Sequence, residues 1–260
     1  MKHNTLLEYR SWLAGTGGLT NSTVLTYYKA VCFLLQDQYL LDCKQMDINA
    51  ILDKLRATKH KGEYSKYKNA FLKLCAFLDI KLSIDIQSEL DNMISEKKKK
   101  HRKLKTVKLP YIQKQIRGIR DKKLRLSFDT MLNTGLRVSE LSQIKKEDCF
   151  FFDDDRMELT FIAKGGKQEK VFVQREKDKN FFNALSSFID TCKDDEKIFY
   201  SSSYLQARAK EKGFSCHDLR RAFAKVTYRD CKDINTVQRL LRHSNIKNTK
   251  LYLKSKVKLT

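Results

Sequence analysis

Helix-breaking residues are scarce in this sequence. Its 260 residues include one proline, Pro110, and nine glycines. Because proline and glycine end or kink helices, a chain that contains few of them favours helical structure. We therefore expect a mainly α-helical protein, with a β-sheet only where the spacing of apolar residues changes.

The sequence also lacks the cysteine spacing of a disulfide framework or of a cysteine-based zinc module. Its seven cysteines are an odd number, and no pair has the CxxC spacing. Acidic runs occur at 153–155 and 194–196, but adjacent carboxylates in a chain do not converge on one ion. We predict reduced thiols, no metal site and no cofactor.

No apolar run reaches the ~20 residues that span a bilayer, and no signal peptide opens the chain. Acidic residues are few as well: 31 Asp and Glu oppose 53 Lys and Arg, a formal net charge of +22. Such an excess favours a polyanionic partner, because Lys and Arg that bind phosphates release condensed counterions. An anionic membrane surface would fit the charge alone. We expect a cytoplasmic, nucleoid-associated protein that binds DNA and no membrane.

Three regions differ in composition. In residues 1–95, apolar side chains recur at helical spacing in several short segments, which predicts a helical bundle. Residues 96–107 are strongly basic, and a segment of this composition cannot build a core of its own. We predict a linker that lies along DNA through its cations, which are Lys97, Lys98, Lys99, Lys100, Arg102, Lys103 and Lys105.

Residues 108–260 combine helices with a small sheet. Helical patterns fill residues 110–133 and resume near residue 180. Between them, apolar residues alternate on both sides of Gly165 and Gly166, which predicts a β-hairpin with Lys164 in its turn. The predicted fold class is mainly α with a small β-sheet: a helical domain followed by a mixed α/β domain.

Three motifs in the second region place functional side chains at helix ends. Arg137 follows a helix that ends at glycine, and Glu140 comes three residues later. Ser215-Cys216-His217-Asp218-Leu219-Arg220 predicts a capping box, with its His and Arg on one helix face. His243 ends another helix, and Tyr252 lies nine residues further on. Each motif alone is also typical of an ordinary surface turn or helix end.

In combination, these residues resemble the tyrosine recombinase (phage integrase) family. That family has an Arg in a T-G-L-R-x-x-E-L setting, a Lys in a β-hairpin, an H-x-L-R pair, and a later His followed by a nucleophilic Tyr. Residues 1–95 look like the family's helical core-binding (SAM-like) domain, and residues 108–260 look like its catalytic domain. The chain has the six residues in the family's order, namely Arg137, Lys164, His217, Arg220, His243 and Tyr252.

The resemblance implies that DNA strands are cut and rejoined through a covalent 3′-phosphotyrosyl bond to Tyr252, without metal or ATP. Arg137 and Arg220 would bind the phosphate, as planar guanidinium donors do. The Tyr hydroxyl, with an ordinary pKa near ~10, needs assistance to attack. By the same resemblance, the remaining residues act as proton donors, hydrogen-bond donors or supports: His217 assists proton transfer, Lys164 protonates the leaving 5′ oxygen, His243 contacts the phosphate and Glu140 holds an Arg.

The family generally acts as a homotetramer on two DNA sites, with a dimer on each, and a monomer in free solution is compatible with this. The task implied is integration, excision, inversion, transposition or resolution, as in mobile elements. A type IB topoisomerase uses nearly the same groups. A non-catalytic DNA-binding or architectural protein would explain the charge, but it would not need the six ordered residues.

The chain departs from the family at Arg242, where a glycine often precedes the second histidine. Glycine at this place suits a left-handed helix end. Arg242 therefore predicts a different helix ending or an additional phosphate contact.

Overall fold

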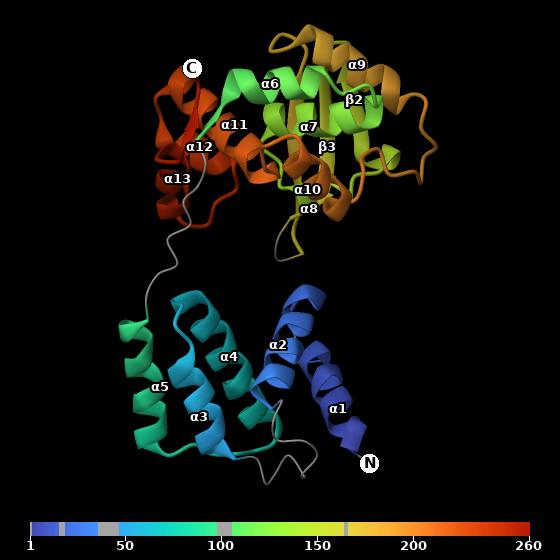
Figure 1. Cartoon of the computed structure of the whole chain (residues 1–260). Coiled ribbons are helices and arrows are strands. Elements are labelled where there is room, and N and C mark those ends of the chain that lie inside the picture. Colours follow the sequence, from blue (N-terminus) through green and yellow to red (C-terminus); the bar gives the residue numbers. More distant parts are fainter. Residues whose placement is uncertain (1, 16–18, 36–46, 98–105, 164–165) are drawn as a thin grey trace. The chain divides into compact units, whose positions relative to one another are not determined.

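The computed structural model of the protein describes residues 2–15, 19–35, 47–97, 106–163 and 166–260. The chain divides into two compact units, Met1–Lys103 and Leu104–Thr260. Figure 1 shows that the described part of the first unit is built from helices, whereas the second unit combines helices with strands. The predicted fold class, mainly α with a small sheet, is confirmed.

The described part of the first unit consists of five helices around two clusters of buried side chains. Three helices have an N-cap residue whose side chain accepts a hydrogen bond from the backbone of the first turn. These residues are Thr20, Asp47 and Ser83. Two buried tyrosines link helices, since Tyr9 donates to Ala70 O and Tyr64 donates to Leu90 O. The helices are α1 (Lys2–Gly15), α2 (Asn21–Leu34), α3 (Ile48–Ala57), α4 (Lys61–Phe77) and α5 (Ile84–Glu96).

The predicted basic linker falls mostly outside the described residues. Lys98, Lys99, Lys100, Arg102, Lys103 and Lys105 all belong to the range that the structure does not describe. Lys97, which follows α5, packs on its own unit: its Nζ donates to Arg56 O at 2.7 Å and lies 5.4 Å from the ring centroid of Tyr64. Contact between the linker and DNA stays a prediction.

Along the sequence of the second unit, helices come both before and after the three-stranded sheet. Before the sheet come β1 (Val107–Lys108), α6 (Leu109–Arg117), α7 (Lys122–Thr134) and α8 (Val138–Leu141). The sheet consists of β2 (Cys149–Asp153), β3 (Arg156–Ile162) and β4 (Gln168–Gln174). After it come α9 (Lys179–Ile189), α10 (Ser202–Glu211), α11 (Cys216–Cys231), α12 (Ile234–Leu240), α13 (Ile246–Leu253) and β5 (Val257–Lys258).

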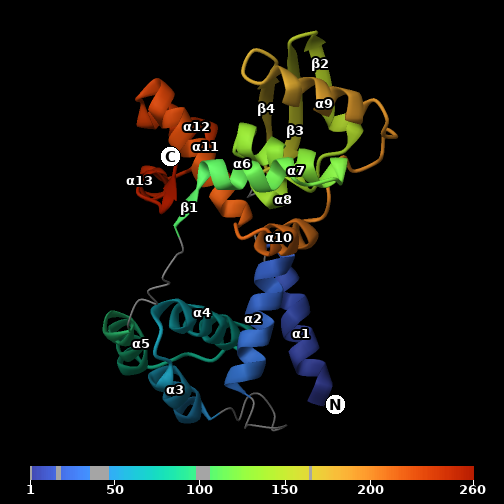
Figure 2. The same cartoon turned by 45° about the horizontal axis from the view of Figure 1, so that its top comes forward.

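The predicted hairpin is formed by β3 and β4, which pair antiparallel from Arg156↔Gln174 to Ile162↔Gln168. Its alternating apolar residues, such as Leu159 and Val173, are buried in one core with side chains of α9. Figure 2 shows α9 alongside the three strands. The turn residues Lys164 and Gly165 lie outside the described residues. The third strand, β2, was not predicted, because its three consecutive phenylalanines do not alternate with polar residues.

Helix α11 is the central element of the second unit, because it packs against α7, α12 and α13. The segment that follows α13 is tied to this helix and to the start of the unit. Val257 of β5 pairs in parallel with Val107 of β1. Lys225 of α11 donates from Nζ to Ser255 O at 2.7 Å and to Val257 O at 2.6 Å. The helix that carries Tyr252 is therefore anchored on its C-terminal side.

Candidate active site

Glu140 lies at the centre of a cluster of arginines. Helix α7 ends at Gly135 in the left-handed conformation, with φ of 66°, and the chain turns into α8 with Arg137 as its N-cap. The backbone N–H of Arg137 donates to Glu140 Oε2 at 2.8 Å, and its guanidinium pairs with Oε1. Although burial raises the pKa of the Glu140 carboxyl, hydrogen bonds from Arg137 and the charge of Arg242 lower it more, so that the net shift is downward.

We expect Gly135→Ala to destabilise the protein by roughly 2–4 kcal/mol. The backbone at Gly135 has a positive φ, and an added Cβ would clash with the ring of Phe223. Urea unfolding of the variant and of wild type measures the loss. Gly62→Ala in α4 is the control, because a Cβ there meets no atom within 4 Å. Equal unfolding midpoints for Gly135→Ala and wild type would contradict the expected steric role.

Arg220 of α11 joins the ends of two other helices. Its side chain is 1% exposed, and its Nη1 and Nη2 donate to the carbonyl oxygens of Gly135 and Leu241. Nη1 also lies 3.8 Å from Glu140 Oε2, whereas Nε is buried and has no hydrogen-bond partner. Burial, followed by the charge of Arg137, lowers the pKa of Arg220 to about 10, so the guanidinium stays charged at neutral pH. The charge of this buried guanidinium favours an anion nearby.

His243 and Tyr252 lie against each other. Their ring centroids are 4.8 Å apart with an interplanar angle of 89°, an edge-to-face arrangement. His243 is 8% exposed, and its Nδ1 lies 3.1 Å from Thr249 Oγ1, one turn before Tyr252 in α13. The Arg221 guanidinium lies 5.8 Å from the centroid of the half-buried Tyr252 ring. Sequence reasoning did not single out Thr249 or Arg221, since no motif predicts these contacts.

Burial, followed by the charges of Arg220, Arg137 and Arg242, lowers the pKa of His243 to about 4, and Glu140 offsets part of this shift. The native imidazole is therefore neutral at pH 7. The pKa of this imidazole is about 6.5 in an unfolded chain. Above pH 6.5 the ring is neutral in both states and does not lower the stability of the fold. As the pH falls from 6.5 toward 4, only the unfolded chain takes up the proton, so the free energy of unfolding decreases. Between pH 7 and pH 5 we expect roughly 2 kcal/mol less stability from this group.

Denaturant unfolding of wild type and His243→Gln at pH 7 and pH 5 tests this shift. The variant should lose less stability than wild type on acidification, because it lacks the titrating ring. Identical losses in both proteins would show that the pKa of His243 is not lowered by its surroundings.

His217 is the second residue of α11, where the predicted capping box of Ser215 and Asp218 is confirmed. The residue is exposed at the surface beside Arg220 and Arg221. Partial desolvation, followed by the charges of these two arginines, lowers the pKa of its imidazole, and Asp218 opposes the shift. A neutral ring that is open to solvent can accept a proton at neutral pH.

Arg242 corrects one prediction from the sequence. Its φ is 52°, so helix α12 ends in the left-handed conformation that glycine usually provides. The N–H of Arg242 bonds to Arg239 O, and the N–H of His243 bonds to Gln238 O, which completes a Schellman motif. The prediction of a different helix ending was wrong, because the left-handed ending is kept with an arginine whose side chain makes contacts of its own. Those contacts include Glu140 Oε2, 3.2 Å from Arg242 Nη2.

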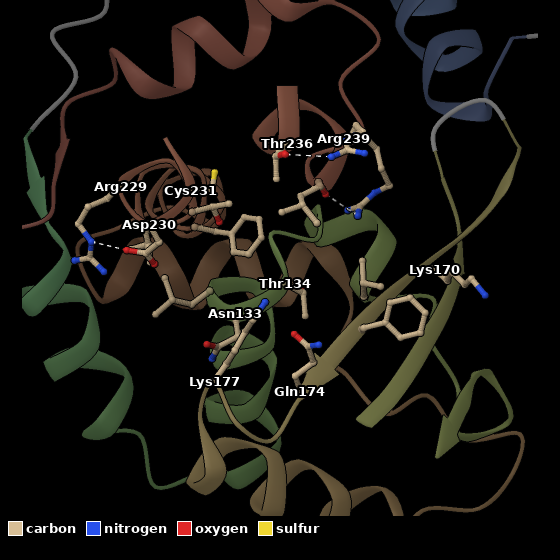
Figure 3. A pocket seen from close by; sticks show the side chains of 18 of the residues that line it. Asn133, Thr134, Lys170, Gln174, Lys177, Arg229, Asp230, Cys231, Thr236 and Arg239 are labelled. Carbon is tan, nitrogen blue, oxygen red and sulfur yellow. Dashed lines mark hydrogen bonds and ion pairs between the residues drawn. The ribbon is translucent and has the colours of Figure 1, made fainter. Parts of the chain in front are cut away.

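The structure thus brings five of the six predicted residues to one region of the second unit, together with Glu140. The sixth, Lys164, lies outside the described residues. A cavity of about 1100 Å³, lined in part by Thr134, Phe223 and Arg242, borders the cluster at Arg242. Figure 3 shows the pairs Arg229–Asp230 and Thr236–Arg239 along this cavity. Within the described ranges, no group of His, Cys, Asp or Glu could hold a metal ion.

No helix in the described part of the chain is both long and apolar enough to cross a membrane.

Comparisons with known proteins find tyrosine recombinases among the proteins similar to this chain. The chain is 34% identical over 143 residues to a tyrosine recombinase XerC of Caldanaerobacter subterraneus subsp. tengcongensis, a match over 46% of this chain and 38% of that protein. It is 26% identical over 271 residues to a tyrosine recombinase of Pseudothermotoga lettingae, over 95% of this chain and 92% of that protein. The chain thus spans less than two thirds of the first relative and nearly all of the second.

Solved structures with the same fold include a lambda integrase(75-356) dimer bound to a COC′ core site. The TM-score is 0.63 at 18% identity, over 96% of this chain and 94% of that chain. A XerH site-specific recombinase bound to difH substrate in a pre-cleavage complex gives a TM-score of 0.60 at 17% identity, over 88% and 74%. The sequence model of the phage integrase family matches residues 106–258, which hold every residue of the cluster. The chain therefore belongs to the phage integrase family of tyrosine recombinases.

Proposed function

We propose that this chain is a site-specific DNA recombinase that cuts and rejoins strands through a covalent 3′-phosphotyrosyl bond to Tyr252. The observation that carries the proposal is the convergence of a tyrosine, two histidines and two arginines in the family-matched domain. These residue types meet the requirements of phosphoryl transfer: a nucleophile, a proton acceptor and fixed positive charge for the phosphate.

In the cleavage step, Tyr252 Oη forms a bond to the scissile phosphorus, and the bond from phosphorus to the 5′ oxygen breaks. His217 accepts the phenolic proton, directly or through water, as its lowered pKa permits. Lys164 gives a proton to the leaving 5′ oxygen. Attack by a 5′ hydroxyl of another strand reverses these steps and restores the phosphodiester.

The added negative charge of the transition state lies on the non-bridging phosphate oxygens. Arg137 and Arg220 supply permanent cations there, and the contacts of Arg220 with two backbone carbonyls hold its charge in place. His243, neutral because its pKa is about 4, contributes a hydrogen bond rather than a charge. Thr249 holds that ring through Nδ1, which leaves Nε2 for the phosphate.

For partners, we propose double-stranded DNA, bound by both units and by the basic linker of residues 96–107. We also propose a homotetramer on two DNA sites. The relatives' structures are consistent with this, since lambda integrase is solved as a dimer on a core site and as a tetramer on a Holliday junction. Residues 1–95 would be the core-binding domain and residues 108–260 the catalytic domain. A location at the nucleoid follows from the DNA partner.

A nicked suicide duplex tests the proposal, because loss of a short fragment beyond the cut traps the covalent intermediate. Sites are first enriched by binding from a random pool, and the protein is then incubated with labelled duplex in EDTA. We expect a protein–DNA adduct on a denaturing gel. Tight binding to the enriched sites with no adduct on any of them would contradict the proposal and favour a DNA-binding protein.

A further inference from the structure

Three non-glycine residues in the described part of the chain have a left-handed backbone: Asp79, Lys232 and Arg242. This conformation is disfavoured for any residue with a Cβ, so its presence needs a reason. Lys232 ends α11 with φ of 54°, and its side chain is exposed. Arg242 ends α12 with φ of 52°, but its side chain is only 12% exposed. The two positions share a backbone and differ in what the side chain does.

The Arg242 guanidinium makes three contacts with three different elements. Its Nη1 donates to Leu240 O of its own helix at 2.9 Å, and its Nη2 donates to Glu140 Oε2 of α8 at 3.2 Å. Its Cζ lies over the ring of Phe161 of β3, 4.9 Å from the centroid. Arg242, the residue directly before His243, therefore links the end of α12 to Glu140, the acid that pairs with Arg137.

Glu140 divides its two oxygens between two arginines. Oε1 accepts from the Arg137 side chain, whereas Oε2 accepts from the Arg137 backbone and from Arg242. Without Arg242, a buried carboxylate oxygen would lose a charged donor, and the carboxylate could rotate toward Arg220, whose Nη1 is 3.8 Å away. That rotation would change the guanidinium positions of Arg137 and Arg220 together.

We propose that Arg242 is a positioning residue of the strand-transfer site. Its side chain holds Glu140 in place so that Arg137 and Arg220 face the phosphate, and its backbone forms the turn that leads into His243. This inference rests on the proposed function and deepens it. The glycine that is usual at this position would keep the left-handed helix end but would lack the side-chain contact with Glu140. With arginine the backbone conformation is less favourable, but the side chain joins α12 to α8.

Single-turnover cleavage of the suicide duplex by Arg242→Gly tests the inference. Glycine tolerates the left-handed backbone, so the Schellman turn is kept and only the side-chain contacts are lost. We expect the cleavage rate constant at saturating DNA to fall roughly 10- to 100-fold, with the DNA dissociation constant within about 3-fold of wild type. Arg242→Lys should recover part of the rate, because its ammonium still reaches Glu140. Lys232→Gly, the matched control, should cleave like wild type.

A double-mutant cycle separates positioning from general damage to the fold. In the Glu140→Gln background, Arg242→Gly should reduce the rate by less than about 3-fold, since the carboxylate through which it acts is gone. NMR titration of His243 gives a readout independent of DNA: loss of the Arg242 cation should raise the pKa of that ring.

The inference would be overturned if Arg242→Gly cleaved at the wild-type rate. It would also be overturned if the double variant lost cleavage rate by the full product of the two single-variant losses. Failure of the proposed function looks different in the same experiment, because wild type itself would then form no adduct. In that case the His243 titration still decides whether Arg242 acts on the cluster.

Discussion

Replacing Tyr252 with Phe should abolish the covalent protein–DNA adduct, with cleavage reduced at least about 1000-fold. Only the attacking oxygen is removed. The aromatic ring remains, and with it the edge-to-face contact with His243 and the cation–π contact with Arg221. Folding and DNA affinity should therefore stay close to those of wild type. Gel quantification of the adduct and a binding titration on the same duplex measure the two quantities separately.

Tyr228→Phe is the matched control for that experiment. Tyr228 lies on α11 and is 38% exposed, and it makes no contact with the cluster among the interactions that the structure describes. This variant should form the adduct at the wild-type rate. An adduct that persists in Tyr252→Phe, or that disappears in Tyr228→Phe, would assign the nucleophile to another residue.

Arg220→Met should lose both cleavage and stability. The guanidinium supplies charge to the phosphate, and loss of such a group costs about 10²- to 10³-fold in rate. It also donates to the carbonyl oxygens of Gly135 and Leu241, which Met leaves buried and unpaired. Each unpaired carbonyl costs about 1–3 kcal/mol, so for two carbonyls we expect roughly 2–6 kcal/mol less stability. Unfolding in urea and single-turnover cleavage at low temperature, where the variant stays folded, measure the two effects.

The conservative variant and an exposed arginine make this result specific. Arg220→Lys keeps the charge but cannot bridge two carbonyls in a fixed plane, so it should regain little of either property. Arg239→Met, at an exposed position of α12, should leave stability and cleavage unchanged. Full cleavage by folded Arg220→Met would remove this residue from the site.

The parts of the site that the sequence predicted are those with local causes. Gly135 ends α7 because a left-handed cap needs no side chain, and Ser215 with Asp218 starts α11 through a capping box. Both causes lie within a few residues of their effect. The β3–β4 hairpin likewise follows from apolar alternation around a glycine pair.

The parts that the sequence did not predict depend on distant partners. Arg242 and Glu140 are 102 residues apart in the chain, so no local pattern predicts their contact. The bond between His243 and Thr249 needs the α12–α13 turn, which no motif defines. Strand β2 escaped prediction because Phe150, Phe151 and Phe152 are consecutive and exposed. Tertiary contacts decide all three features.

The most direct test of the account is to identify the residue that carries DNA in the trapped adduct. Nuclease digestion, proteolysis and tandem mass spectrometry of the adduct give both the modified side chain and the end of the strand attached to it. We predict a nucleotide linked through its 3′ phosphate to Tyr252, with a free 5′ hydroxyl on the released fragment. Attachment to any other residue, or through a 5′ phosphate, would contradict the mechanism.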